Sequence, residues 1–268
     1  MKKFIPFLII PLLIGLLILL IIDNKEKVIS KIMTVSTNYH YLYEDNQTID
    51  VGFYTNNLEL PINELALYDN FKLKSENSNT IVNLDLKEVN YSHDEVYLQE
   101  VYRNYIFKFV MPNLENDLKI EDAYLNFKLA DEGEFELFLG SFKLIVKDDY
   151  KALNWHLAEG SKSDTNNHSI SSLKIGIPSS LATNDFTIDI GLDSNVEYEI
   201  NEQLLIINIP KLAYFTNNLF VLISTDSNTY YLSNTFYTKE YSLLSKTSGI
   251  INIYEFSWVN SCKKKLFK

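Results

Sequence analysis

The hydropathy pattern begins with an uncharged run from Phe4 to Ile22, bounded by Lys3 and Asp23. Apart from two prolines and one glycine, every residue in the run is apolar. As a helix this run would be about 28 Å long, close to the thickness of the hydrocarbon core of a bilayer. The pattern therefore predicts one transmembrane helix within an N-terminal anchor of residues 1–27.

A cleaved signal peptide is the main alternative for this segment. Signal peptides have a shorter apolar core, of about 7–15 residues, followed by small residues at the cleavage site. Here no alanine precedes Ala66, and the only cysteine, Cys262, lies far from the position that a lipoprotein signal requires. We favour a retained anchor, with a cytoplasmic N-terminus and the following region outside the cell. The lysines on the two sides of the run give only a small bias for that orientation.

Beyond the anchor, apolar and polar residues alternate in short segments that end at Asn, Asp, Pro or Gly, which is typical of half-buried antiparallel strands. The segment from Ala123 to Leu129 shows the alternation most clearly, with Asn126 and Lys128 on the polar side. The predicted strands are residues 48–54, 65–68, 71–74, 81–89, 105–111, 123–129, 135–146, 173–177, 186–192, 196–200, 204–209, 219–225, 229–235 and 250–256.

These strands predict an all-β fold with two antiparallel β-sandwiches, Ig-like, after the transmembrane helix. The predicted boundaries are 28–149 for the first sandwich, 150–258 for the second and 259–268 for a basic C-terminal tail. A weak internal repeat supports the division, because the apolar strands at 105–111 and 203–209 are both followed by a Pro-x-Leu sequence. The alternative interpretation is that hairpins made of common residues resemble one another by chance.

Charge and composition exclude some functions. The net charge of −11 disfavours nucleic-acid binding, because an acidic surface repels phosphates. The single cysteine excludes an internal disulfide. One arginine, Arg103, among abundant Lys, Asn and Ile favours an AT-rich genome, such as that of a Gram-positive bacterium.

No motif for catalysis, cofactor binding or metal binding emerges from the sequence, so we predict no site residues of these kinds. The four histidines, His40, His93, His156 and His168, have no second ligand at metal-binding spacing. Ser92, His93, Asp94 and Glu95 could suggest a hydrolytic triad, but sequence adjacency is no indication of one, and we interpret them as a surface turn.

Three further segments have structural interpretations. Asp193 to Glu199 begins like a calcium loop but lacks its glycine and final glutamate, so we interpret its charges as the solvent face of a sheet. Residues 131–134 are predicted to form a hairpin turn. Trp155 and Trp258 are predicted to lie in the core or at a sheet edge rather than in a ligand site.

The combined expectation is a non-enzymatic, membrane-anchored extracytoplasmic protein that binds another protein. One form of this role is an accessory subunit of a membrane complex or exporter. A surface module that binds cell-wall polymer or an envelope ligand, with Lys263 to Lys268 contributing, is the first alternative. A surface hydrolase is the second.

Overall fold

The computed structural model describes most of the chain from residue 28 onward. The described residues are 28–43, 47–58, 62, 64–110, 113–129, 133–146, 150–162, 169–182, 185–192, 196–216, 218–232, 236–237 and 242–258. Strands account for 63% and helices for 7% of this part, so the protein is nearly all-β.

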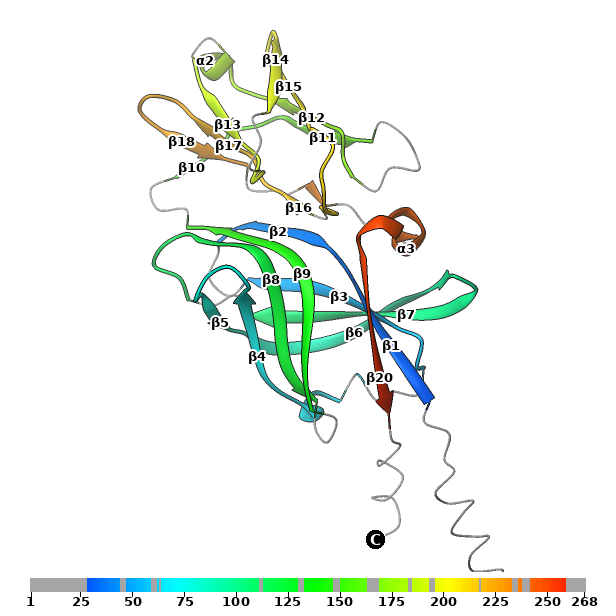
Figure 1. Cartoon of the computed structure of the whole chain (residues 1–268). Coiled ribbons are helices and arrows are strands. Elements are labelled where there is room, and N and C mark those ends of the chain that lie inside the picture. Colours follow the sequence, from blue (N-terminus) through cyan, green and yellow to red (C-terminus); the bar gives the residue numbers. More distant parts are fainter. Residues whose placement is uncertain are drawn as a thin grey trace, which may run out of the picture. The chain divides into compact units, whose positions relative to one another are not determined.

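The strands of the N-terminal half, with the last strand of the chain, form two five-stranded sheets (Figure 1). In the first, the order is β20 (Ile251–Trp258), β1 (Val28–Val35), β3 (Thr48–Thr55), β7 (Glu100–Val110) and β6 (Asp85–Tyr97). In the second, the order is β2 (Thr37–Leu42), β9 (Gly133–Ile145), β8 (Leu118–Leu129), β4 (Tyr68–Ser75) and β5 (Ile81–Asn83).

The later part of the chain forms two four-stranded sheets and a two-stranded one. The first has the order β10 (Lys151–Ala152), β18 (Thr229–Tyr231), β17 (Leu222–Ser224) and β13 (Thr187–Asp189). The second has the order β11 (Leu157–Ser161), β12 (Ser172–Gly176), β15 (Leu204–Asn208) and β14 (Glu197–Asn201). β16 (Asn218–Leu219) pairs with β19 (Phe236–Tyr237). The helical segments are short: η1 (Leu65–Leu67), α2 (Ser179–Ala182), α3 (Leu243–Lys246) and η3 (Ser248–Ile250).

Alternation along the strands builds the core. In β8 the burial of side chains alternates from Ala123 to Leu129, so one face of the strand is apolar and the other meets solvent. The later sheets enclose a separate apolar cluster, whose fully buried members include Leu173, Ile175, Leu205, Ile207 and Ile223.

The predicted arrangement of these strands is wrong. The described strands form a four-bladed β-propeller in place of two Ig-like sandwiches. Two strand pairs, β2 with β9 and β10 with β18, are parallel, although the sequence pattern indicated antiparallel sandwiches. Alternation along a strand shows which face is buried, but it does not show which sheet or strand lies beside it.

The fold prediction also placed a transmembrane helix before the β-rich region. No helix in the described part of the chain has the length and apolar character needed to cross a membrane. The segment for which that helix was predicted, Phe4 to Ile22, lies outside the described residues.

Contacts between residues divide the chain into two units. One comprises residues 1–30 and 255–268, of which the structure describes only the outer ends of β1 and β20. The other runs from Lys31 to Tyr254 and contains every side-chain contact on which the following sections depend.

Candidate protein-binding hairpin

The β6–β7 hairpin projects from the Lys31–Tyr254 unit. Its register runs from Asp85 opposite Val110 to Tyr97 opposite Glu100, so only Leu98 and Gln99 form the turn. β7 pairs on its other side with β3, whereas β6 is the edge of the sheet. Figure 1 shows the turn end of this hairpin projecting beyond the other strands of the sheet.

The backbone of this turn adopts a conformation that its residues disfavour. Leu98 and Gln99 have φ angles of 49° and 68°. Two-residue hairpin turns with both φ angles positive are normally built from Asn-Gly or Asp-Gly. A residue with a Cβ atom costs roughly 1–2 kcal/mol in this region, so leucine at position 98 makes the turn less stable than glycine would.

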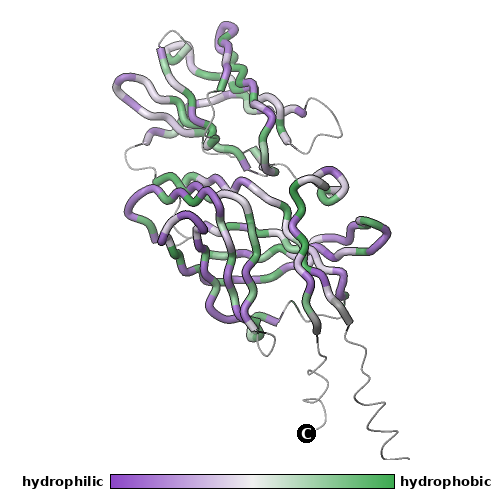
Figure 2. The backbone as a smooth tube through the Cα atoms, viewed as in Figure 1, coloured by the Kyte–Doolittle hydropathy of each residue, from purple (hydrophilic) through white to green (hydrophobic). Residues whose placement is uncertain are grey.

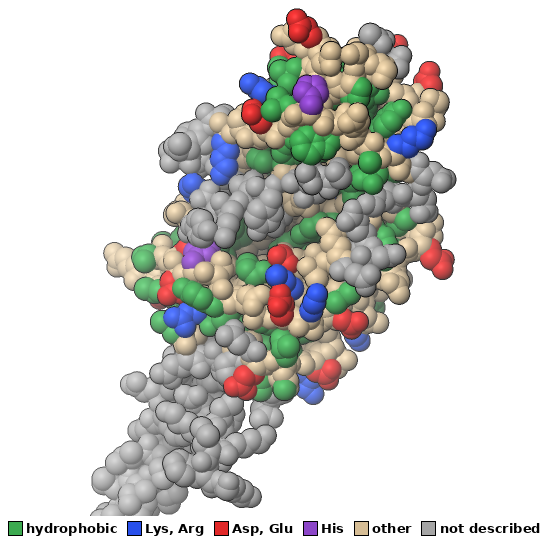
Figure 3. All heavy atoms as spheres, turned by 180° about the vertical axis from the view of Figure 1, so that it is seen from behind, with side chains coloured by type: hydrophobic (Ala, Val, Ile, Leu, Met, Phe, Trp, Pro, Cys, Tyr) green, Lys and Arg blue, Asp and Glu red, His purple; other side chains and the backbone are tan. Residues whose placement is uncertain are grey.

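Three apolar side chains surround the turn, and we call them the hairpin tip: Val96, Leu98 and Val101. They are 68%, 74% and 44% exposed, and Val96 lies directly opposite Val101 in the ladder. Figure 2 shows the hydrophobic stretch along this end of the hairpin, and Figure 3 shows hydrophobic side chains gathered on the same end seen from behind. Scattered exposed apolar residues need no explanation, but an apolar cluster on a strained turn suggests a binding surface.

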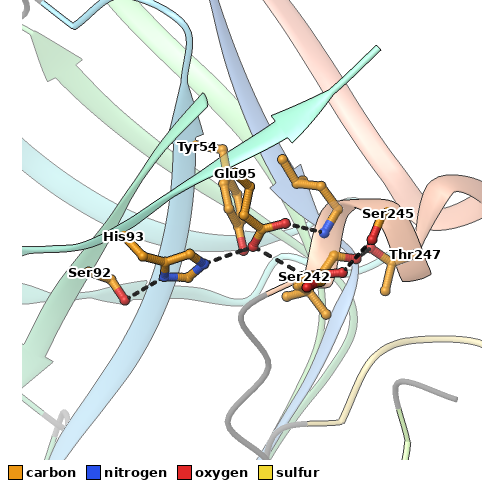
Figure 4. Close-up of polar contacts among 9 residues, drawn as sticks. Tyr54, Ser92, His93, Glu95, Ser242, Ser245 and Thr247 are labelled. Atoms are coloured by element: carbon orange, nitrogen blue, oxygen red, sulfur yellow. Dashed lines mark hydrogen bonds and ion pairs between the residues drawn. The ribbon is translucent and has the colours of Figure 1, made fainter. Parts of the chain in front are cut away.

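A register shift between Tyr91 and His93 marks a β-bulge in β6. Consecutive residues of a regular strand point to opposite faces, but a bulge redirects a side chain. Ser92 and His93 lie on the same side as a result, with Ser92 Oγ 2.9 Å from His93 Nδ1. His93 Nε2 lies 2.8 Å from Glu95 Oε1, so three residues of one strand form a chain of polar contacts (Figure 4).

Glu95 connects this strand to α3. Its side chain is almost fully buried and accepts hydrogen bonds from the backbone N–H groups of Leu243 and Leu244, at 3.2 and 2.9 Å. The Tyr54 hydroxyl donates a further hydrogen bond to it, at 3.1 Å. Ser242 precedes α3 but makes no side-chain capping bond, so the carboxylate of Glu95 caps the helix from a distant strand.

The other strand of the hairpin is fixed by Glu100. Its carboxylate accepts a hydrogen bond from Tyr102 Oη at 2.7 Å and forms an ion pair with Lys31 Nζ at 3.0 Å. Both contacts lower the pKa of Glu100, and the hydrogen bond from Tyr102 has the larger effect. The hairpin tip is therefore presented on a stem that is held on both strands, which reduces the entropy lost when a partner binds.

The order Ser92, His93, Glu95 has a definite chemical meaning. A carboxylate can only accept, so His93 Nε2 carries the hydrogen toward Glu95, and in a neutral ring Nδ1 accepts the hydroxyl hydrogen of Ser92. The hydrogen bonds therefore run from hydroxyl to imidazole to carboxylate, the same order as in the Ser–His–Asp triad of hydrolases. Hydrolysis also needs oxyanion donors and a substrate pocket beside the nucleophile. Two grooves of about 560 and 530 Å³ are lined by other residues, and neither includes Ser92.

Burial beside this network raises the pKa of Tyr54, and the negative charge of Glu95 raises it further. Burial likewise raises the pKa of Tyr39 and Tyr68. In the unfolded chain tyrosines lose their proton near pH 10, whereas these three keep it to higher pH when folded. Their contribution to the free energy of unfolding is therefore complete below about pH 10 and is lost as the pH rises toward the folded pKa values.

We expect these three groups together to lower the free energy of unfolding by about 4 kcal/mol per pH unit above about pH 10, because each contributes about 1.4 kcal/mol per unit. The pKa values of Tyr124 and Tyr254 are also raised and add to the total slope. Urea unfolding at a series of pH values between about 9 and 11 measures this slope. Tyr54→Phe should reduce the slope by about 1.4 kcal/mol per pH unit, the contribution of one group. An unchanged slope in that variant would show that Tyr54 titrates alike in both states.

The structure corrects one of the sequence interpretations. Residues 92–95 are not a surface turn but part of β6, and Glu95 is buried. The sequence pattern also missed the hairpin tip, because the predicted strands ended at 89 and resumed at 105.

The remaining histidines lie apart from this network. His40 is buried and contacts Ser141 Oγ at 3.0 Å, and that hydroxyl donates its one hydrogen to Asn38 Oδ1, at 2.7 Å. Ser141 therefore serves as an acceptor for His40 and not as its nucleophile. His156 is exposed, and His168 lies outside the described residues. Within the described part, no group of three or more His, Cys, Asp or Glu residues could hold a metal ion.

The other residues that the sequence singled out fall into two sets. Trp155 packs against the later apolar cluster, and Glu197 and Glu199 are exposed on β14, as expected for the face of a sheet. The other set lies outside the described residues and comprises Asp131, Glu132, 193–195 and 263–268. For Trp258 the structure describes the backbone but not the side chain.

No protein-family model matches the chain, and no curated protein is similar to it.

Proposed function

We propose that this protein is a non-enzymatic binding module whose partner protein docks on the hairpin tip. The observation that carries the proposal is Leu98, which is 74% exposed on a turn whose backbone disfavours leucine. A side chain that costs stability and touches little of its own protein is explained if it contacts another. The four-bladed arrangement is compatible with this role, since propellers often mediate protein binding.

The chemistry of the tip defines the partner. Val96, Leu98 and Val101 require an apolar pocket. Asp94 and Glu100 flank the tip, but Arg103 and Lys31 already pair with their carboxylates. The tip therefore calls for a small apolar pocket, and the net charge of −11 favours a partner whose surface is basic overall.

The test places a photo-reactive benzoylphenylalanine at position 101 in the full-length chain. Irradiation in the native cells should give one discrete protein adduct, identified by mass spectrometry. Leu98→Lys should lower the adduct yield at least about tenfold, because a buried charge replaces the central anchor.

Ile81→Lys is the matched control, since Ile81 is an apolar strand residue that is 60% exposed on β5, in the other five-stranded sheet. That variant should give the same adduct at the same yield. Equal yields from Leu98→Lys and Ile81→Lys would refute docking at the tip.

Location at the cell membrane, with the β-rich region outside the cell, stays a prediction from the sequence. Purification in mild detergent from native membranes, with identification of the photo-adduct, tests it together with the proposed role as an accessory subunit. An adduct with a cytoplasmic protein would contradict the location and leave the docking site supported.

A hydrolase is the second candidate, favoured by the contacts that connect Ser92, His93 and Glu95. An activated Ser92 would react with a fluorophosphonate probe, and Ser92→Ala would abolish the labelling. Absence of labelling at Ser92 in the folded protein leaves the network as a structural support for α3.

A further inference from the structure

A second surface for a partner lies on β14, far along the chain from the hairpin tip. β14 is the outer strand of its sheet, with β15 on one side and no other described strand on the other side. All five of its residues, Glu197 to Asn201, are exposed. Figure 1 shows β14 and β15 projecting together as a hairpin.

The side chains of β14 alternate in chemistry as well as in direction. Glu197 and Glu199 lie on one face, and Tyr198 and Ile200 lie on the other. Tyr198 stacks on the buried Phe186 with ring centroids 5.2 Å apart, yet 40% of its surface remains exposed. The strand thus offers an acidic row on one face and a partly covered apolar row on the other.

The backbone of the same strand has an open row of hydrogen-bonding groups. Asn201 pairs with Leu204 across the two-residue turn, and such a closing pair exchanges hydrogen bonds. Alternation then directs the N–H and C=O groups of Tyr198 and Ile200 toward the open edge.

Edge strands are usually protected by charged side chains, proline, a bulge or short length. β6, the edge of another sheet, has two register shifts. β14 pairs with β15 in continuous register from Glu197 opposite Asn208, and it contains neither lysine nor proline. Its protection is the acidic row of Glu197 and Glu199, which disfavours an added acidic strand but is satisfied by a basic one.

We propose that β14 accepts an extended segment of a partner protein as an added strand, and that this segment alternates basic and apolar residues. An added strand places its side chains opposite those of β14 with the same period of two. Lysine or arginine at every second position meets Glu197 and Glu199, while the intervening apolar residues lie beside Tyr198 and Ile200.

The probe is a labelled five-residue peptide that alternates lysine and valine, added to the full-length protein in mild detergent. Fluorescence polarisation should show binding, and deuterium exchange should slow in the segment that contains β14. A matched peptide that alternates glutamate and valine should not bind.

Glu197→Lys with Glu199→Lys should weaken binding of the lysine peptide about tenfold. Glu159→Lys with Asp226→Lys changes the net charge equally at exposed residues outside β14 and should leave binding unchanged. Equal weakening by both pairs, protection of another segment, or no binding of the lysine peptide would overturn the proposal. None of these outcomes bears on the hairpin tip, because Leu98 remains intact in every variant.

Discussion

Gly140→Ala is expected to lower the free energy of unfolding by about 4 kcal/mol or more. Gly140 has a φ angle of +117°, a region that residues with a Cβ atom rarely adopt. It lies opposite Thr37 in the parallel pair of β2 and β9. An added Cβ atom would overlap the backbone nitrogen and carbonyl oxygen of Thr37. Both obstacles are backbone, so rotation of a side chain cannot relieve them.

Gly133→Ala separates the cost of the positive φ angle from the cost of the steric overlap. Gly133 also has a positive φ angle, of 101°, but an added Cβ atom would meet nothing within 4 Å. This variant should lose only about 1–2 kcal/mol, the cost of the backbone conformation. Urea or thermal unfolding of both variants measures the difference, and the yield of soluble protein reports a variant that fails to fold. Equal losses would show that β2 moves away and that the close approach contributes nothing.

The sequence predicts individual strands but not the pairing of β2 with β9, in which Gly140 lies. The strands predicted at 48–54 and 123–129 are present as β3 and as part of β8, because alternation along a strand is a local property. The pairing of β2 with β9 joins residues about a hundred positions apart, and no local pattern encodes it. The arrangement of the sheets as blades was missed for the same reason.

The hairpin tip was not predicted from the sequence, for a different reason. Short hairpins are recognised by Asn-Gly or Asp-Gly at the turn, and here Leu98 and Gln99 occupy those positions. The polar sequence from Ser92 to Glu95 resembles a loop because its composition is that of an exposed segment. Glu95 is buried only because Tyr54 and the start of α3 supply hydrogen-bond donors from distant parts of the chain. Sites that violate local rules are the sites where function is most often found.

Glu95→Ala should lower the free energy of unfolding by about 3–5 kcal/mol, because it removes the acceptor for several buried donors at once. The Tyr54 hydroxyl and the N–H groups of Leu243 and Leu244 would each lose a partner. A buried donor without an acceptor costs about 1–3 kcal/mol, and the hydroxyl can rotate to find another. Glu95→Gln keeps one carbonyl oxygen and should lose about half as much. Chemical unfolding at neutral pH measures both losses.

Glu100→Ala is the control for this result, since it removes the same residue type from the other strand of the same hairpin. Glu100 also accepts hydrogen bonds from Lys31 and Tyr102, but 43% of its side chain is exposed. Water can replace those contacts, so the loss should stay below about 1 kcal/mol. A similar loss for Glu95→Ala and Glu100→Ala would show that water reaches the N-terminus of α3. A large loss for Glu95→Ala alone would show that the buried carboxylate of Glu95, through its contacts with Tyr54 and α3, stabilises the stem from which the tip is presented.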